Sequence, residues 1–302
     1  RHVFALTTGA MFSAGLFLLP GLAAAKAGPA AILAYLIAGL LAVPAMLSVS
    51  ELATALPKAG GAYYFVERAL GPAAGTIAGF GTWLSLVLKD AFALVGMSAY
   101  LVLIVDVPGR TLALVLIAAF TLINVVGSKT TASVQVLLVV FVLAMMGWFL
   151  VDGLWETQSR GFDGSNLDPF CTSGTSGVVA VVGLVFVSYG GLTNVASAAE
   201  EIDDPSRRIP LGMALSLVVG TLVYTLGVLV AVAVVPAEVL HEDLAPIHTA
   251  AVAIMPPFGA WLIVIAALAA FASALNAGIL AAARYPMAMA RDGLLPAWAG
   301  GL

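Results

Sequence analysis

Eight apolar stretches, each about long enough to cross a lipid bilayer as a helix, restrict the fold of this 302-residue chain more than any other feature. The predicted spans are residues 3–25, 30–50, 74–104, 111–127, 131–151, 177–198, 209–235 and 258–283. With 62% hydrophobic and 9% charged residues, the chain has too little polar surface for a water-soluble protein. The strict alternation of a membrane β-barrel is absent, so we predict an all-α integral membrane protein in a lipid bilayer.

The basic residues between the spans predict the orientation. A cytoplasmic N-terminus places eight Lys and Arg residues inside and three outside, not counting Lys89 within a span. The inside group is Arg1, Lys58, Arg68, Lys129, Arg207, Arg208, Arg284 and Arg291, and the outside group is Lys26, Arg110 and Arg160. The positive-inside rule therefore favours a cytoplasmic N-terminus, and we expect the plasma membrane. Residues 3–25 are not expected to be a signal peptide, because seven further spans follow.

Two of the spans carry helix-breaking sequences near their centres. Residues 9–21 place three glycines and a proline in the first span, and residues 187–191 place Gly190-Gly191 in the sixth. Main chain freed at membrane depth survives only where it faces protein or water. Free N–H groups after a break favour a carboxylate, and free carbonyls before it favour an ammonium or a small cation. The alternative is that these glycines only permit kinks and close helix packing.

The positions of the two breaks predict internal symmetry. The first span runs from inside to outside and the sixth from outside to inside, so two five-span repeats headed by these spans are inverted. We expect a first repeat over 1–151, an extracellular loop over 152–176, and an incomplete second repeat over 177–302 with three of its five spans. The expected architecture is a five-plus-five transporter fold with helices 1 and 6 broken, truncated after helix 8.

Four segments, in order and in register, resemble the amino acid–polyamine–organocation permeases. They are residues 9–21, residues 51–63 with Glu51-Leu52, Gly60-Gly61 and Tyr63, residues 199–210 with Glu200-Glu201 and Ile209-Pro210, and residues 284–296 with Asp292-Gly293. The resemblance implies a carrier for an amino acid or a related amine. It also implies that the substrate binds to main chain at both breaks, at Met11, Phe12, Ser13, Ala14 and Gly15 and at Val187, Ser188, Tyr189, Gly190 and Gly191. Ser13 and Thr193 depart from the family pattern, which puts side-chain selectivity in doubt.

Lys89, followed by Asp90, lies near the centre of the third span. A charge at this depth costs at least about 2.5–3.5 kcal/mol, so it generally faces a cavity or a partner. Lys89 and Asp90 are therefore candidates for proton coupling, or Lys89 holds a substrate carboxylate. A structural ion pair is the alternative. Some proton-coupled relatives carry a lysine in the fifth span, where Val142 stands here.

Ser273 and Asn276 are three residues apart in the eighth span and share one helix face. The resemblance makes them candidates for sodium coupling near the first break, because sodium-coupled relatives place hydroxyl groups there. The alternative is an ordinary hydrogen bond between helices. The coupling ion is accordingly expected to be H⁺, with Na⁺ as the second possibility.

Other functions have weaker support in the sequence. A sensor that binds an amino acid without moving it is the main alternative. No filter repeat indicates a channel, and no catalytic motif indicates an enzyme. His241 and His248 lack metal-ligand spacing and no basic patch is present, so we expect no metal, no cofactor and no nucleic acid partner.

Overall fold

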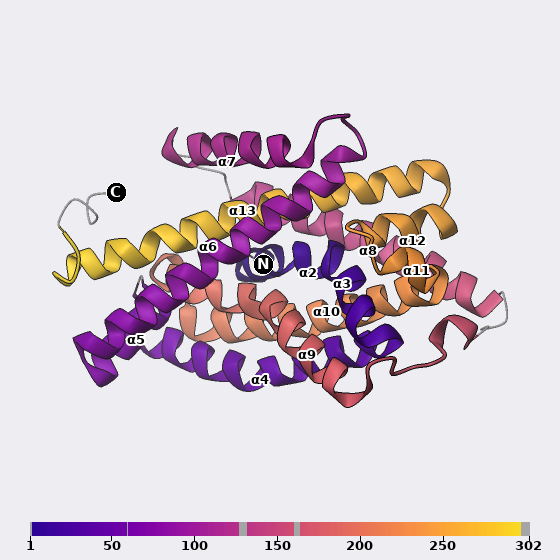
Figure 1. Ribbon diagram of the computed structural model, residues 1–302. Helices are drawn as coiled ribbons and strands as arrows, with labels where there is room; N and C mark the ends of the chain where they lie inside the picture. The colour runs from indigo at the N-terminus through magenta and orange to yellow at the C-terminus, as the bar shows by residue number, and fades with distance from the viewer. Residues whose placement is uncertain (1, 59, 127–131, 160–163, 297–302) are drawn as a thin grey trace.

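The computed structural model of the chain describes residues 2–58, 60–126, 132–159 and 164–296, and it is built from helices throughout these ranges (Figure 1). Six of the helices are long and apolar enough to cross a membrane. The predicted all-α membrane fold is therefore confirmed. In the middle of the bundle α6 (Pro72–Val102) packs along α13 (Pro257–Arg291), and α4 (Ala31–Ala55) packs along α10 (Pro205–Val234).

The first predicted span is divided into three helices. It comprises α1 (His2–Met11), α2 (Ala14–Phe17) and α3 (Leu19–Ala27), followed by the short turn η1 (Gly28–Ala30). Phe12 and Ser13 separate α1 from α2, and Ser13 has an extended φ of −162°. The predicted break in the first helix is therefore present, at the predicted residues.

The sixth predicted span changes helix type at its break. It begins as α9 (Gly174–Phe186) and continues from Val187 as the 3₁₀ helix η3 (Val187–Glu201). A 3₁₀ helix of 15 residues is unusual, because runs longer than three or four residues are uncommon. The interruption thus begins at the predicted residue, but it takes the form of a narrower helix and not of unwound main chain.

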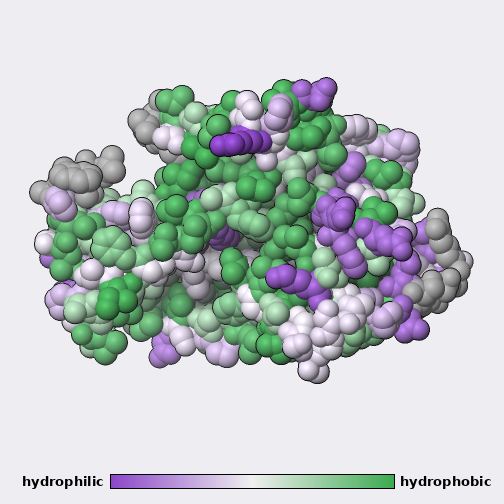
Figure 2. Space-filling model, in the orientation of Figure 1, coloured by the Kyte–Doolittle hydropathy of each residue, from purple (hydrophilic) through white to green (hydrophobic). Residues whose placement is uncertain are grey.

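The remaining helices complete the bundle and its two ends. They are α5 (Gly61–Leu70), α7 (Gly109–Val126), α8 (Ala132–Ser159), η2 (Gly164–Leu167), α11 (Ala237–Leu240) and α12 (Pro246–Ile254). The short helices α5, α11 and α12 lie at opposite ends of the bundle, α5 at the end that is predicted to be cytoplasmic (Figure 1). Hydrophobic side chains cover much of the visible face, as Figure 2 shows, with hydrophilic residues gathered over the α11 and α12 end. This is the surface expected of a protein surrounded by lipid.

Small residues let α1 and η3 touch through their main chains. Residues 7–21 are all buried, and α1 packs against η3, α10, α8 and α13. A Cβ atom added at Gly191 would overlap the carbonyl of Ala10, and one added at Gly15 would overlap the Ser188 side chain. Close approach of this kind is how helices associate in lipid, where hydrophobicity does not drive them together. The first break is therefore shielded from lipid by neighbouring helices.

This packing predicts different results for two glycines of the same span. Gly191→Ala should lower the free energy of unfolding by about 1–3 kcal/mol, because the added methyl group meets main chain that cannot move aside. Gly183→Ala is the matched control, since nothing lies within 4 Å of its added Cβ atom. It should be neutral or stabilise by up to about 1 kcal/mol. Denaturation of both variants in detergent measures the difference, and equal stabilities would contradict the contact.

Candidate functional site

Side chains from three other helices bind the main-chain carbonyls that the first break leaves free. Tyr224 Oη donates to the Met11 carbonyl at 2.6 Å, and Tyr35 Oη donates to the Gly15 carbonyl at 2.8 Å. Lys89 Nζ lies 2.9 Å from the Ala10 carbonyl oxygen, and Tyr100 Oη donates to the Phe17 carbonyl at 2.9 Å. Carbonyls at the end of a helix lack intrahelical partners and carry partial negative charge. The four side chains therefore stabilise the broken conformation of α1–α3.

Unlike the carbonyls, several main-chain N–H groups at the break have no hydrogen-bond partner among the described residues. The amides of Leu16 and Phe17 both donate to the Ser13 carbonyl at 3.0 Å. The amides of Ser13, Ala14 and Gly15 make no hydrogen bond to other described residues. First-turn amides of this kind have no acceptor in their own helix and suit an anion such as a carboxylate. The break thus presents free donors beside carbonyls that are already bound.

The predicted site residues of η3 divide between two faces. Ser188, Tyr189 and Gly191 are buried, whereas Val187 is 52% exposed and Gly190 is exposed. A 3₁₀ helix has three residues per turn, so residues 187 and 190 share a row that differs from the row of 188 and 191. The structure therefore brings Ser188 and Gly191 to the first break and directs Val187 and Gly190 away from it.

Ser188 is the polar side chain of η3 that lies closest to the break. It is 4% exposed, and its hydroxyl makes no hydrogen bond to the described residues, although it lies against Gly15. A buried hydroxyl without a partner is uncommon and calls for an explanation. With the free amides of residues 13–15, it forms a cluster of hydrogen-bonding groups between the two broken spans.

Tyr189 belongs to an aromatic cluster beside this site. Its hydroxyl donates to the Tyr35 carbonyl at 3.0 Å, and its ring lies edge-on to that of Tyr224 with centroids 5.4 Å apart. Tyr35 and Tyr224 are likewise edge-on at 5.8 Å. Each such edge-on pair of rings stabilises the folded protein by about 0.5–1.5 kcal/mol beyond the burial of its surface. Tyr189 therefore packs the wall of the site in this conformation.

Lys89 and Asp90 point toward different helices. The Lys89 ammonium contacts α1, whereas Asp90 packs so closely on α13 that a Cβ atom at Gly278 would overlap its carboxylate. No ion pair joins Lys89 to Asp90 among the described residues. Among the described residues, Lys89 therefore contacts the main chain of the broken helix and does not form the alternative ion pair with Asp90.

Ser273 meets the first helix one turn before the break. The amide of Gln135 in α8 donates to Ser273 Oγ at 2.5 Å, and both groups press against Gly9. Val142 and Ser273 line a void of about 10 Å³ here, about the space of one water molecule. The predicted neighbourhood of Ser273 and the first break is therefore present, with its hydroxyl already engaged. Asn276 does not reach this void and lines a larger cavity.

That larger cavity has a volume of about 830 Å³ and opens at the end of the bundle that is predicted to be cytoplasmic. Its walls come from the start of α1, the second half of η3, α10 and α13. Asn194 and Asn276 line it, and neither side-chain amide makes a hydrogen bond to the described residues. It is in the size range of small-molecule pockets and leads alongside α1 and η3, the elements that meet at the break.

At the opposite end, α11 and α12 cover the start of α3. A Cβ atom at Gly21 would overlap the Asp243 carbonyl, so the main chains of the two segments are in close contact here. Burial lowers the pKa of His248 in α12, while the nearby Asp243 carboxylate acts in the opposite direction. At the predicted outer end, α11 and α12 thus pack against α3, whereas the cavity lies at the predicted inner end.

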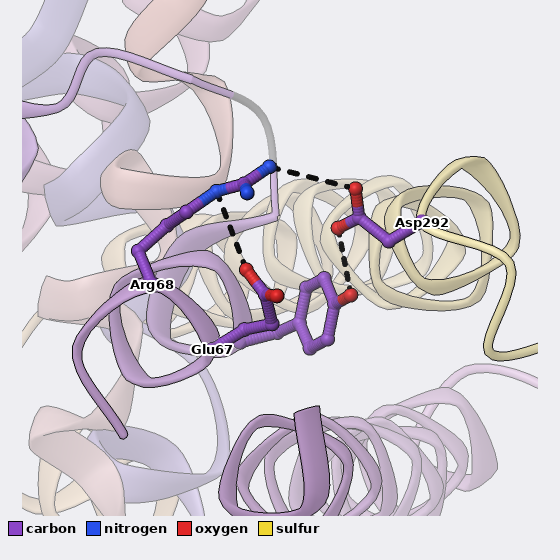
Figure 3. Close-up of polar contacts among 4 residues, drawn as sticks. Glu67, Arg68 and Asp292 are labelled. Atoms are coloured by element: carbon purple, nitrogen blue, oxygen red, sulfur yellow. Dashed lines mark hydrogen bonds and ion pairs between the residues drawn. The ribbon is translucent and has the colours of Figure 1, made fainter. Parts of the chain in front are cut away.

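Two segments of the family resemblance meet at the end of the bundle that is predicted to be cytoplasmic, and Figure 3 shows their polar contacts. Tyr63 Oη donates to Asp292 Oδ2 at 2.7 Å, and Arg68 lies 3.6 Å from the other oxygen of Asp292 and 3.3 Å from Glu67. Burial raises the pKa of Tyr63 well above its usual value, and the hydrogen bond to Asp292 adds to the effect. These contacts tie α5 to the end of α13.

The sequence prediction missed the groups that bind the freed carbonyls. Tyr35, Tyr100 and Tyr224 each lie inside an apolar span, where a hydroxyl group requires a hydrogen-bond acceptor. That requirement could have identified them as partners for broken main chain. Gln135 and Asn194 carried the same signal, as polar side chains within spans.

Comparisons with known proteins agree with this geometry. Residues 2–302 match a family model described as amino acid permease. The chain is 30% identical to the mitochondrial cationic amino acid transporter 3 of Arabidopsis thaliana, over 98% of this chain and 52% of the relative. It is 28% identical to a branched-chain amino acid permease of Bacillus subtilis, over 96% of this chain and 66% of the relative. The chain spans about half the length of the plant relatives it matches. These relatives are named as transporters, which supports the expectation that the chain is not an enzyme.

The fold also matches a solved structure. A crystal structure of a mutant manganese transporter from Eremococcus coleocola superimposes with a TM-score of 0.60 at 16% identity. The match covers 94% of this chain and 64% of that chain. At this identity the likeness concerns the arrangement of helices alone.

The bound carbonyls predict that loss of the Tyr224 hydroxyl destabilises the protein more than loss of the Tyr189 hydroxyl. Tyr224→Phe should lower the free energy of unfolding by about 1–3 kcal/mol, because the Met11 carbonyl stays buried without its partner. Tyr189→Phe is the matched control: its acceptor, the Tyr35 carbonyl, lies inside α4 and keeps its helical bond. Denaturation in detergent should rank Tyr224→Phe as the less stable variant. The reverse order would contradict this account of the break.

Proposed function

Because this chain belongs to the amino acid permease family, we propose that it forms the substrate-binding part of a secondary transporter for an amino acid. The substrate binds between the first break and η3 and crosses the membrane by alternating access. One observation carries this proposal: the free amides of residues 13–15 lie in the protein interior, next to the unpartnered hydroxyl of Ser188. A zwitterionic amino acid supplies the carboxylate that these donors lack.

The cavity on the predicted inner side supports a carrier. Its lining reaches Leu6 of α1 and Asn194 of η3, while at the other end the segment after α11 packs closely on Gly21 of α3. We assign the structure to an inward-facing state of the transport cycle. Helices α2 and η3 then hold the substrate, and the surrounding bundle moves around them.

The proposal includes the organisation expected from the sequence. Residues 1–151 form the first repeat and 177–302 form part of an inverted second repeat, with the N-terminus in the cytoplasm. The excess of basic residues on that side supports this orientation. The membrane is proposed to be the plasma membrane. Matched relatives are named for mitochondrial and vacuolar membranes, so localisation of a tagged protein in cells is the direct test.

Lys89 is proposed to couple transport to protons. Its ammonium binds the end of α1, so gain or loss of its proton changes the charge at the carbonyl end of the broken helix. Asp90, whose carboxylate packs on Gly278 of α13, is the second candidate for proton coupling. Ser273 and Asn276 remain the candidates for Na⁺, although the Ser273 hydroxyl is already bound to Gln135.

The first functional prediction concerns the space at the break. Gly15→Leu should abolish amino acid uptake in liposomes while the protein still inserts into the membrane, because the side chain would occupy the region between Gly15 and Ser188. Gly147→Leu is the matched control, since nothing lies within 4 Å of a Cβ atom at Gly147. It should keep normal uptake. Normal uptake kinetics for Gly15→Leu would place the binding site elsewhere.

The second functional prediction concerns coupling. Lys89→Met should remove accumulation driven by a pH gradient, whereas counterflow exchange of substrate persists, because substrate binding does not need the proton. Lys58→Met, at an exposed lysine between α4 and α5, is the control and should keep both activities. If Lys89→Met keeps both as well, another group couples transport. Binding without uptake in the unmodified protein would indicate a sensor.

A further inference from the structure

Two cavities follow one another along the first helix, and a hydrogen bond lies between them. The large cavity of about 830 Å³ lies at the predicted inner end, and the void of about 10 Å³ touches the break at Phe12. We propose that Gln135 is an inner gate, whose side chain closes the passage of water from the large cavity to the void at the break. The inference rests on the function proposed above only for the side of the membrane that the cavity faces.

The same three helices, α1, α8 and α13, line both cavities. From the large cavity to the void, the lining moves by about one helical turn on each of them. The successive lining residues are Leu6 and Gly9 on α1, Gln135 and Val139 on α8, and Ala277 and Ser273 on α13. On all three helices this step leads toward the predicted outer side. The void is therefore the continuation of the large cavity, one turn deeper in the bundle.

Gln135 and Ser273 join across the boundary between the two cavities. Gln135 lines the large cavity, Ser273 lines the void, and the Gln135 amide donates to Ser273 Oγ at 2.5 Å. Both groups press on α1 at Gly9, where an added Cβ atom would overlap the amide nitrogen and the hydroxyl oxygen. The absence of a side chain at Gly9 makes room for this bridge. The three helices thus meet at one level, and the contact separates the cavities.

An amide side chain is suited to open and close such a passage. On the side of the void, Val139 is 3% exposed and Val142 is 2% exposed, so the surroundings are apolar and buried. An amide without a partner is costly in such surroundings, and the bond to Ser273 therefore holds Gln135 in the closed position. Turned into the large cavity, the amide bonds to water instead, which is nearly as favourable as a direct hydrogen bond. Opening thus replaces one hydrogen bond with another.

The size of the void determines what the gate admits. It has about the space of one water molecule, and it touches Phe12, the first residue of the break. An open Gln135 therefore hydrates the break from the inner side, whereas a closed Gln135 keeps the water of the large cavity away from it.

Labelling of a cysteine placed in the void tests the gate. Val142→Cys is made in the full chain with Cys171→Ser, which removes the native, exposed cysteine. The purified protein reacts in detergent, without substrate, with a small cationic methanethiosulfonate. Adding Gln135→Ala should raise the labelling rate at least about tenfold, because the rate follows the accessible population and the short side chain no longer reaches Ser273.

A cysteine on the other side of the bridge is the matched control. Asn276→Cys lies on α13, one turn from Ser273, and faces the large cavity. It should be labelled readily and at the same rate with Gln135 or with Gln135→Ala. Gln135→Met is the second variant, because it keeps the length of the side chain and loses only the hydrogen bond. With Val142→Cys it should also be labelled faster than the protein that retains Gln135.

Each outcome decides one part of the inference. Rapid labelling of Val142→Cys while Gln135 is present, or equally slow labelling in both Gln135 variants, overturns the gate. Fast labelling with Gln135→Ala and slow labelling with Gln135→Met overturns the part assigned to the bond with Ser273. Because no substrate is present, failure of the gate leaves the proposed transport function intact. Failure of amino acid uptake in liposomes would contradict that function without changing the labelling rates.

Discussion

The structure depends on one constraint: main-chain groups freed inside a membrane must find partners. The interruptions on either side of α2 release carbonyls from the ends of α1 and α2, and Tyr224, Tyr35, Tyr100 and Lys89 bind four of them. These donors come from α10, α4 and α6, so the break fixes where three other helices must lie. These four interior hydrogen bonds therefore follow from the two interruptions of the first span.

The two interrupted spans meet this constraint in different ways. The first leaves the helical conformation and depends on outside partners, whereas η3 keeps an internal hydrogen-bonding pattern by becoming narrower. As a result, free donors collect on one side of the site, at residues 13–15, and η3 contributes small residues and the Ser188 hydroxyl. In the proposed function, this asymmetry orients a substrate that has a carboxylate at one end.

The sequence predicted the features that follow from hydropathy and helix breaking. The apolar helices, the gap near Ser13 and the change at Val187 all follow from runs of apolar residues interrupted by glycine. The sequence predicted eight spans, whereas six of the described helices are long and apolar enough to cross a membrane. It did not predict the 3₁₀ form of η3, because the choice between helix types depends on packing against α1 and α4. For the same reason it did not predict that Val187 and Gly190 lie on a different row of the helix from Ser188 and Gly191.

For Lys89, the sequence predicts that a partner exists but does not identify it. Its depth in the third span indicated a partner or a cavity, but an isolated span cannot identify which group it meets. Only the folded arrangement shows that its ammonium lies on the carbonyl end of α1, 79 residues away in sequence, and not on the adjacent Asp90. A lysine there neutralises the helix end and, in the proposed function, places a positive charge beside the substrate. The group that stabilises the break consequently also shapes the electrostatics of the site.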